Sequence, residues 1–66
     1  MKNNLKVLRA IAGVSQAELA EKIGVSRQTI NAMELGKYVP STVLALKLAA
    51  FFNKEVSEIF SLEDKD

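Results

Sequence analysis

Three polar side chains in the stretch "GVSRQTINAMELG", residues 24–36, are of the types that read nucleic-acid bases: Arg27, Gln28 and Asn31. Arginine can donate two hydrogen bonds to O6 and N7 of guanine, and glutamine or asparagine can form a matching pair with N6 and N7 of adenine. A helix that needed only solubility would normally carry Glu and Lys on its outer face. These side chains are therefore candidates for base contacts, and the alternative is an ordinary solvated face.

The apolar residues of the same stretch indicate where the polar side chains point. Ile30 and Met33 would anchor a helix to a core, and successive helical residues are about 100° apart. With both buried, the opposite face carries Arg27, Gln28, Asn31, Ala32 and Leu35. Ala32 is short and offers only a methyl contact, which suits the methyl group of thymine.

Residues 16–34 have the pattern of a helix-turn-helix. The letters "SQAE" form a capping box that starts a helix at Gln16. Ala20 is small where two helices would cross closely, and Gly24 supplies the left-handed conformation that ends the first helix. Ser26 then caps the helix that carries the candidate base-contacting side chains.

The rest of the chain predicts three more helices, so the expected fold is an all-α, compact five-helix bundle. The predicted N-terminal caps are Asn3 or Asn4, Ser15, Ser26 and Ser41, and the predicted stops are Gly13, Gly24, Gly36 and Asn53. Residues 42–52 are apolar nearly all round, as expected for a central helix, and a short fifth helix covers residues 56–60. Whether residues 61–66 pair with the N-terminal "MKNN" as a short strand is left open.

Composition limits the classes of function. The 66 residues form one domain, residues 1–66, with no room for a small-molecule effector domain. The absence of Cys and His predicts no thiolate or imidazole metal site, no cofactor and no enzyme activity. No apolar run is long enough for a membrane span, and the N-terminus lacks the apolar core of a signal peptide, so we expect a cytoplasmic protein.

The charge is distributed unevenly along the chain. Residues 1–54 carry eight Lys or Arg against three Glu, whereas residues 55–66 carry five acidic residues against one Lys. The ordinary interpretation is a solubilising acidic tail. The functional interpretation is that the basic residues 1–54 approach a polyanion while the acidic tail points away from it.

The segment "LRAIAGVSQAELAEKIGVSRQTINAMELGKYVPS" resembles the DNA-binding domain of the Cro and phage-repressor family, also called the xenobiotic-response-element family. It is similar to the short regulators that consist of this domain alone. The resemblance implies a lambda-repressor-like fold and double-stranded DNA as partner. It also implies that Arg9 pairs with Glu34, although the sequence alone leaves open that these are separate surface charges.

The same resemblance implies phosphate contacts from Gln16, Ser26 and Thr29. Lys37 and Tyr38 follow Gly36 and are further candidates, through the ammonium and the phenol. The alternative interpretation is that Lys37 is an ordinary loop lysine and Tyr38 a half-buried tyrosine, with no contact to phosphates.

Apolar residues near the end of the chain exceed what the core of a small bundle needs. We therefore expect a homodimer interface formed by Val39, Val56, Ile59, Phe60 and Leu62. The predicted function is a transcriptional repressor that binds a palindromic operator as a homodimer. The alternative is a protein-interaction or antitoxin-type helix-turn-helix module, which would more often carry apolar or acidic residues in place of Arg27, Gln28 and Asn31.

Overall fold

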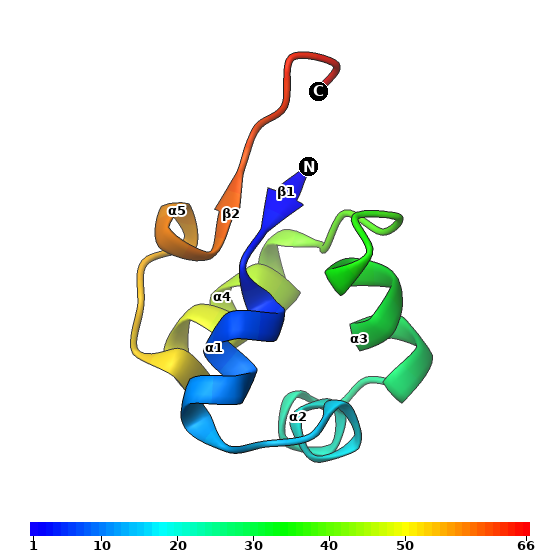
Figure 1. Cartoon of the computed structure of the whole chain (residues 1–66), viewed down its shortest axis with the longest axis vertical. Helices are drawn as coiled ribbons and strands as arrows, with labels where there is room; N and C mark the ends of the chain where they lie inside the picture. Colours follow the sequence, from blue (N-terminus) through cyan, green and yellow to red (C-terminus); the bar gives the residue numbers. More distant parts are fainter.

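The computed structural model describes residues 1–66 and contains five helices and two short strands (Figure 1). In chain order they are β1 (Lys2–Asn3), α1 (Leu5–Ala12), α2 (Gln16–Ile23), α3 (Arg27–Glu34), α4 (Thr42–Phe52), α5 (Val56–Ile59) and β2 (Phe60–Ser61). The prediction of an all-α bundle of five helices is confirmed. None of these helices has the length and apolar character that crossing a membrane would require.

Serine side chains cap the N-termini of α2, α3 and α4, as predicted. The hydroxyls of Ser15, Ser26 and Ser41 accept hydrogen bonds from backbone N–H groups three residues later, at 3.0, 3.1 and 3.1 Å. At Ser15 the capping box is complete, because the Glu18 carboxylate also accepts from the Ser15 N–H at 3.0 Å. These bonds satisfy N–H groups that have no partner inside the helix.

Asn4 occupies the N-cap position of the first helix but forms no side-chain capping hydrogen bond, and the neighbouring Asn3 supplies one instead. Its side-chain oxygen accepts from the Leu5 N–H at 3.1 Å, while its amide nitrogen donates to the Met33 carbonyl at 2.7 Å. One side chain therefore fixes both the start of α1 and the end of α3. The chain leaves α4 through Asn53, whose φ of 54° is the only positive value outside glycine.

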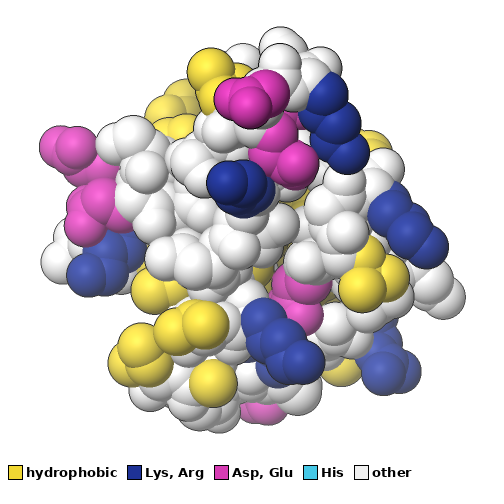
Figure 2. Space-filling model, turned by 45° about the horizontal axis from the view of Figure 1, so that its top comes forward, with side chains coloured by type: hydrophobic (Ala, Val, Ile, Leu, Met, Phe, Trp, Pro, Cys, Tyr) yellow, Lys and Arg dark blue, Asp and Glu magenta, His cyan; other side chains and the backbone are white.

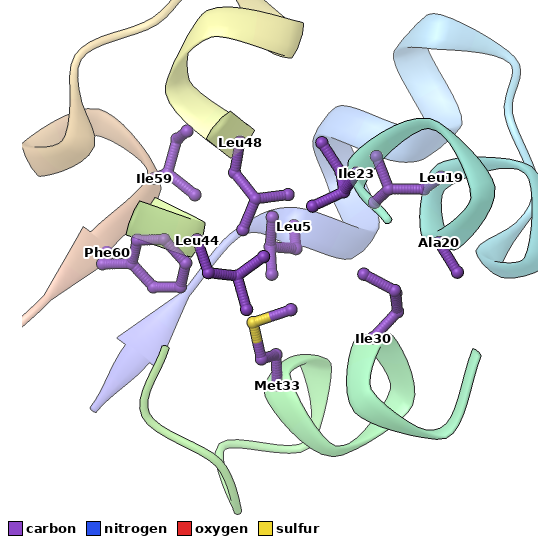
Figure 3. Packing of buried hydrophobic residues seen from close by; sticks show 10 residues of the cluster. All are labelled: Leu5, Leu19, Ala20, Ile23, Ile30, Met33, Leu44, Leu48, Ile59 and Phe60. Atoms are coloured by element: carbon purple, nitrogen blue, oxygen red, sulfur yellow. The ribbon is translucent and has the colours of Figure 1, made fainter. Parts of the chain in front are cut away.

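Ten side chains form a single core between the helices (Figure 3). They are Leu5, Leu19, Ala20, Ile23, Ile30, Met33, Leu44, Leu48, Ile59 and Phe60. Figure 3 shows Met33 of α3 pointing toward Leu5 and Leu44, so α1, α3 and α4 share one apolar centre. Ala20, at 3% exposure, lets α2 and α3 approach closely, as its size predicted.

Helix α4 is not covered on all sides, which corrects the expectation of a fully central helix. Leu44 and Leu48 are buried, but Val43 and Leu46 expose 63% and 58% of their surface. The reason is that one-turn α5 is too short to cover the outer face of the eleven-residue α4.

The prediction that Ile59 and Phe60 supply a dimer surface is also wrong. Only 2% and 7% of their surfaces are exposed, and both belong to the core of the monomer. Because α5 ends at Ile59 and the chain continues directly into β2, both side chains turn inward. Figure 3 shows Ile59 beside Leu48 and Phe60 beside Leu44.

The two ends of the chain lie together, which answers the question left open by the sequence. Strands β1 and β2 pair antiparallel, with Lys2 opposite Ser61 and Asn3 opposite Phe60. Beyond β2, the amino group of Met1 lies 3.1 Å from a Glu63 carboxylate oxygen and 3.2 Å from one of Asp66. The acidic tail is thus folded against the N-terminus, at the top of Figure 1.

We expect Ile59→Asp to unfold the domain, because a carboxylate would enter the apolar core without a partner. The cost should be about 3–5 kcal/mol, a large part of the stability of so small a domain. The measurement is a thermal melt followed by circular dichroism. Val7→Asp is the control, since Val7 is 58% exposed, and its melt should stay close to that of the wild type. A folded Ile59→Asp variant would contradict the core position of this residue.

Candidate nucleic-acid interface

Helix α3 lies at one edge of the molecule, on the right of Figure 1, where its outer face is uncovered. Ile30 and Met33 are buried on its inner face. Arg27, Gln28 and Asn31 are exposed on its outer face, and Ala32, which follows Asn31, is half-buried. The helical spacing in the sequence therefore placed these four side chains on the correct side of the helix.

The outer face of α3 borders a hollow of about 370 Å³ that extends to the start of α2 and to the loop after α3. We call its lining the recognition surface, and it consists of Gln16, Arg27, Gln28, Asn31, Ala32, Leu35 and Lys37. The sequence alone indicates no DNA contact for Leu35, although the helical spacing puts it on the same face as Arg27, Gln28 and Asn31. It is 60% exposed, an unusual position for a leucine among polar neighbours.

An ion pair beneath this surface joins α1 to α3. Arg9 Nε lies 2.7 Å from Glu34 Oε2, and Arg9 Nη2 donates to Glu34 Oε1 at 3.2 Å. A third guanidinium hydrogen bond, at 3.1 Å, goes to the Val14 carbonyl. The side chains are only 16% and 6% exposed, so Arg9 and Glu34 are not separate surface charges.

The surroundings of the ion pair keep both partners charged. Burial opposes ionisation of Glu34, but hydrogen bonds from Arg9 and Gln16 outweigh it and hold the pKa of this carboxyl below its usual value. The hydrogen bond to Glu34 in turn raises the pKa of the Arg9 guanidinium. Glu34 is therefore a carboxylate at neutral pH and can only accept hydrogen bonds.

Gln16 connects the ion pair to the recognition surface. Its amide nitrogen donates to Glu34 Oε1 and to Asn31 Oδ1, both at 3.1 Å. These two bonds use both N–H groups of the side chain. The phosphate contact expected of Gln16 is left to its backbone N–H, which has no partner inside the helix because it lies in the first turn of α2.

The two hydroxyls at the start of α3 bond to each other. Ser26 Oγ and Thr29 Oγ1 are 2.9 Å apart, and Ser26 Oγ also accepts from the Thr29 N–H. Only one hydroxyl hydrogen is needed between the two oxygens, so the other remains free to donate. This free donor lies where the sequence predicted phosphate contacts.

Lys37 and Tyr38 follow the end of α3 and are both exposed. The Lys37 N–H donates to the Ala32 carbonyl at 2.9 Å, which fixes the loop against the helix. Its ammonium takes part in none of the ion pairs of the structure. Figure 2 shows Lys and Arg side chains along the right-hand side, toward α3, and acidic side chains mainly at the top and left.

A second hollow, of about 260 Å³, lies between the loop before α4 and helix α5. We call it the apolar hollow, and its lining is Met1, Val39, Pro40, Ser41, Thr42, Ala45, Leu46, Val56 and Phe60. It brings together three of the residues expected at a dimer interface, Val39, Val56 and Phe60, of which Phe60 belongs to the core. Leu62 is 78% exposed but does not line it, and Leu46 is an addition that the sequence did not reveal.

Comparison with known proteins places these features in a family. A family model described as helix-turn-helix matches residues 5–59. An uncharacterized HTH-type transcriptional regulator of Methanocaldococcus jannaschii is 53% identical over 66 residues, covering 100% of both chains. A second such regulator, from Bacillus subtilis, is 48% identical over the same coverage. The solution structure of the SOS-response transcriptional repressor LexA from Eubacterium rectale aligns with a TM-score of 0.81 and 32% identity, over 96% of this chain and 67% of that one.

We expect Arg9→Ala to destabilise the domain by roughly 3 kcal/mol at pH 7, because it leaves the Glu34 carboxylate buried without its partner. Since the pKa of Glu34 is lowered on folding, the stability it provides is present above the ordinary Glu pKa of about 4.3 and is lost as the pH falls through the lowered value. The difference between the variant and the wild type should therefore shrink in acid.

Urea unfolding of both proteins at pH 7 and near pH 3 measures this difference. Glu21→Gln provides a control, because Glu21 is exposed on α2 and forms no ion pair. Its unfolding free energy should match that of the wild type within about 0.5 kcal/mol. A difference between Arg9→Ala and wild type that stays constant across the two pH values would contradict an ionised, paired Glu34.

Proposed function

The chain belongs to the Cro/C1-type helix-turn-helix family of DNA-binding transcriptional regulators, and we propose that it recognises a specific operator by placing α3 in the major groove. The observation that supports this most strongly is the recognition surface, where a guanidinium, three carboxamides and a free ammonium line one hollow. A helix fits the major groove, which is about 12 Å wide. We also propose that the protein acts in the cytoplasm.

The side chains of α3 divide into base readers and phosphate contacts. Arg27 suits guanine and Gln28 suits adenine, each through two hydrogen bonds, and Ala32 suits a thymine methyl. Asn31 lies one turn after Arg27 and reaches the next base pairs. Because Arg27, Gln28 and Asn31 are exposed and share one face with the half-buried Ala32, the four side chains can approach the groove together.

Phosphate contacts would flank the base readers on both sides. On one side are the Gln16 backbone N–H and the hydroxyl pair of Ser26 and Thr29. On the other are Lys37 and Tyr38, in the loop held against the end of α3. Such contacts set the position of a protein on DNA but carry no sequence information themselves.

We further propose that two copies associate through the apolar hollow and read a palindrome. One reading helix covers only a few base pairs, and a lone small module gains little surface for tight specific binding. Val39 and Leu46 expose 61% and 58% of their surface beside this hollow, and Val56 lines it. Two copies should hold their α3 helices about 34 Å apart, one turn of B-DNA. We propose that the protein acts as a repressor, because occupying an operator is enough to block transcription.

We expect Gln28→Ala and Lys37→Ala to weaken binding in different ways. Gln28→Ala should cost about 1–3 kcal/mol at the operator and relax the preference at one base pair. Lys37→Ala should weaken operator and random DNA alike and reduce the slope of log K against log salt by about one.

Gel shifts on an operator selected from genomic fragments, with random DNA beside it and at several salt concentrations, separate these effects. Equal losses on both DNAs for both variants would refute the division into base and phosphate contacts. Absence of any shift at low salt with the wild type would favour a protein-interaction module instead.

We expect sedimentation at micromolar concentration to give twice the 7.2 kDa mass of the chain. Val39→Asp should shift the protein to monomer and reduce operator binding, since a carboxylate would enter the apolar interface. Val43→Asp is the matched control, because Val43 is equally exposed at 63% but lies outside the apolar hollow. A wild-type monomer that binds a palindrome without cooperativity would refute the dimer and leave DNA binding intact.

A further inference from the structure

The amide of Asn31 has a defined orientation before any DNA arrives. Glu34 is a carboxylate and can only accept, so Gln16 must turn its amide nitrogen toward it. The second N–H of that nitrogen donates to Asn31 Oδ1 at 3.1 Å. The oxygen end of Asn31 is therefore held toward α2, and its Nδ2 end forms no hydrogen bond within the protein.

The orientation of the Asn31 amide starts from Glu34, a side chain whose own position is fixed by hydrogen bonds. Glu34 is held by two hydrogen bonds from Arg9 at 2.7 and 3.2 Å, and its side chain is 6% exposed. Asn31, in contrast, is exposed on the recognition surface. The Glu34 carboxylate thus determines, through Gln16, which end of the exposed Asn31 amide faces outward.

Leu35 provides an apolar neighbour for this outward N–H group. It lies four residues after Asn31 and lines the same hollow, with 60% of its surface exposed. Side chains four residues apart on a helix lie one above the other, and a leucine side chain leans toward the preceding turn. A hydrogen-bond donor and a branched apolar group therefore stand side by side on the recognition surface.

Resting on the proposed reading of DNA by α3, we propose that Gln16 is a positioning residue that presents Asn31 as a hydrogen-bond donor, and that Asn31 and Leu35 together select thymine. Thymine is the base whose major-groove edge places an acceptor, O4, beside a methyl group. Asn31 Nδ2 would donate to O4, and Leu35 would contact the methyl.

The other three bases match this pair of groups less well. Adenine presents an acceptor at N7 but no methyl, and the donor at its N6 needs the Asn31 oxygen that is already turned toward Gln16. Guanine presents two acceptors but no methyl, and cytosine presents only a donor. This assignment differs from the usual pairing of asparagine with adenine, and the difference comes from Gln16.

Selection from a random-sequence duplex pool tests which base Asn31 reads. The proteins compared are the wild type, Asn31→Ala and Gln16→Met, which keeps the length of the side chain but lacks both N–H groups. The position whose preference disappears in Asn31→Ala should be thymine in the wild type. Gln16→Met should reduce that preference at least threefold, leave the positions read by Arg27 and Gln28 unchanged, and remain folded, because Glu34 keeps both of its hydrogen bonds from Arg9.

Replacing that thymine by deoxyuridine removes only the methyl group. The wild type should bind about fourfold more weakly, as expected for loss of one buried methyl. Leu35→Ala should bind the two DNAs within a factor of about two of each other.

Three outcomes overturn the inference while DNA binding stands: a base other than thymine at the Asn31 position, an unchanged preference there in Gln16→Met, or an undiminished deoxyuridine effect in Leu35→Ala. Failure of the wild type to enrich any sequence would refute the proposed function itself, and this inference with it.

Discussion

The ion pair between Arg9 and Glu34 is the interaction on which the rest of the structure depends. It lies between the first helix and the helix of the recognition surface, and it is nearly closed to solvent. A core of ten residues could hold these helices together but could not alone set their rotation, since apolar contacts have little directionality. The two hydrogen bonds from the Arg9 guanidinium to the Glu34 carboxylate are directional, and they fix the rotation of the two helices relative to each other. Removing one partner leaves the other buried and charged, so the pair also ties the placement of the recognition surface to folding.

Much of this molecule could be predicted from local rules. Ser15, Ser26 and Ser41 start helices because a hydroxyl satisfies N–H groups nearby in the chain, and Gly24 and Asn53 end them because the backbone needs positive φ there. The outer face of α3 followed from helical spacing alone. In each case the determining contact lies within a few residues.

What could not be predicted depends on contacts between distant segments. In the sequence Ile59 and Phe60 fit a dimer surface, but the end of α5 and strand β2, which pairs with β1, bring them into the core beside α4. The direction of the Gln16 amide depends on a carboxylate 18 residues away. The lining of the apolar hollow by Leu46 required knowing how far α5 covers α4.

The double role of Asn3 constrains how the domain can open. This residue belongs to β1, accepts from the first turn of α1 and donates to the Met33 carbonyl at the end of α3. Fraying of the terminal strands would therefore break all three connections at once. In many domains the chain ends exchange their amide protons independently of the interior. Here Asn3 connects the terminal strands to α1 and α3, so opening of the strands would also remove a hydrogen bond from each of these two helices.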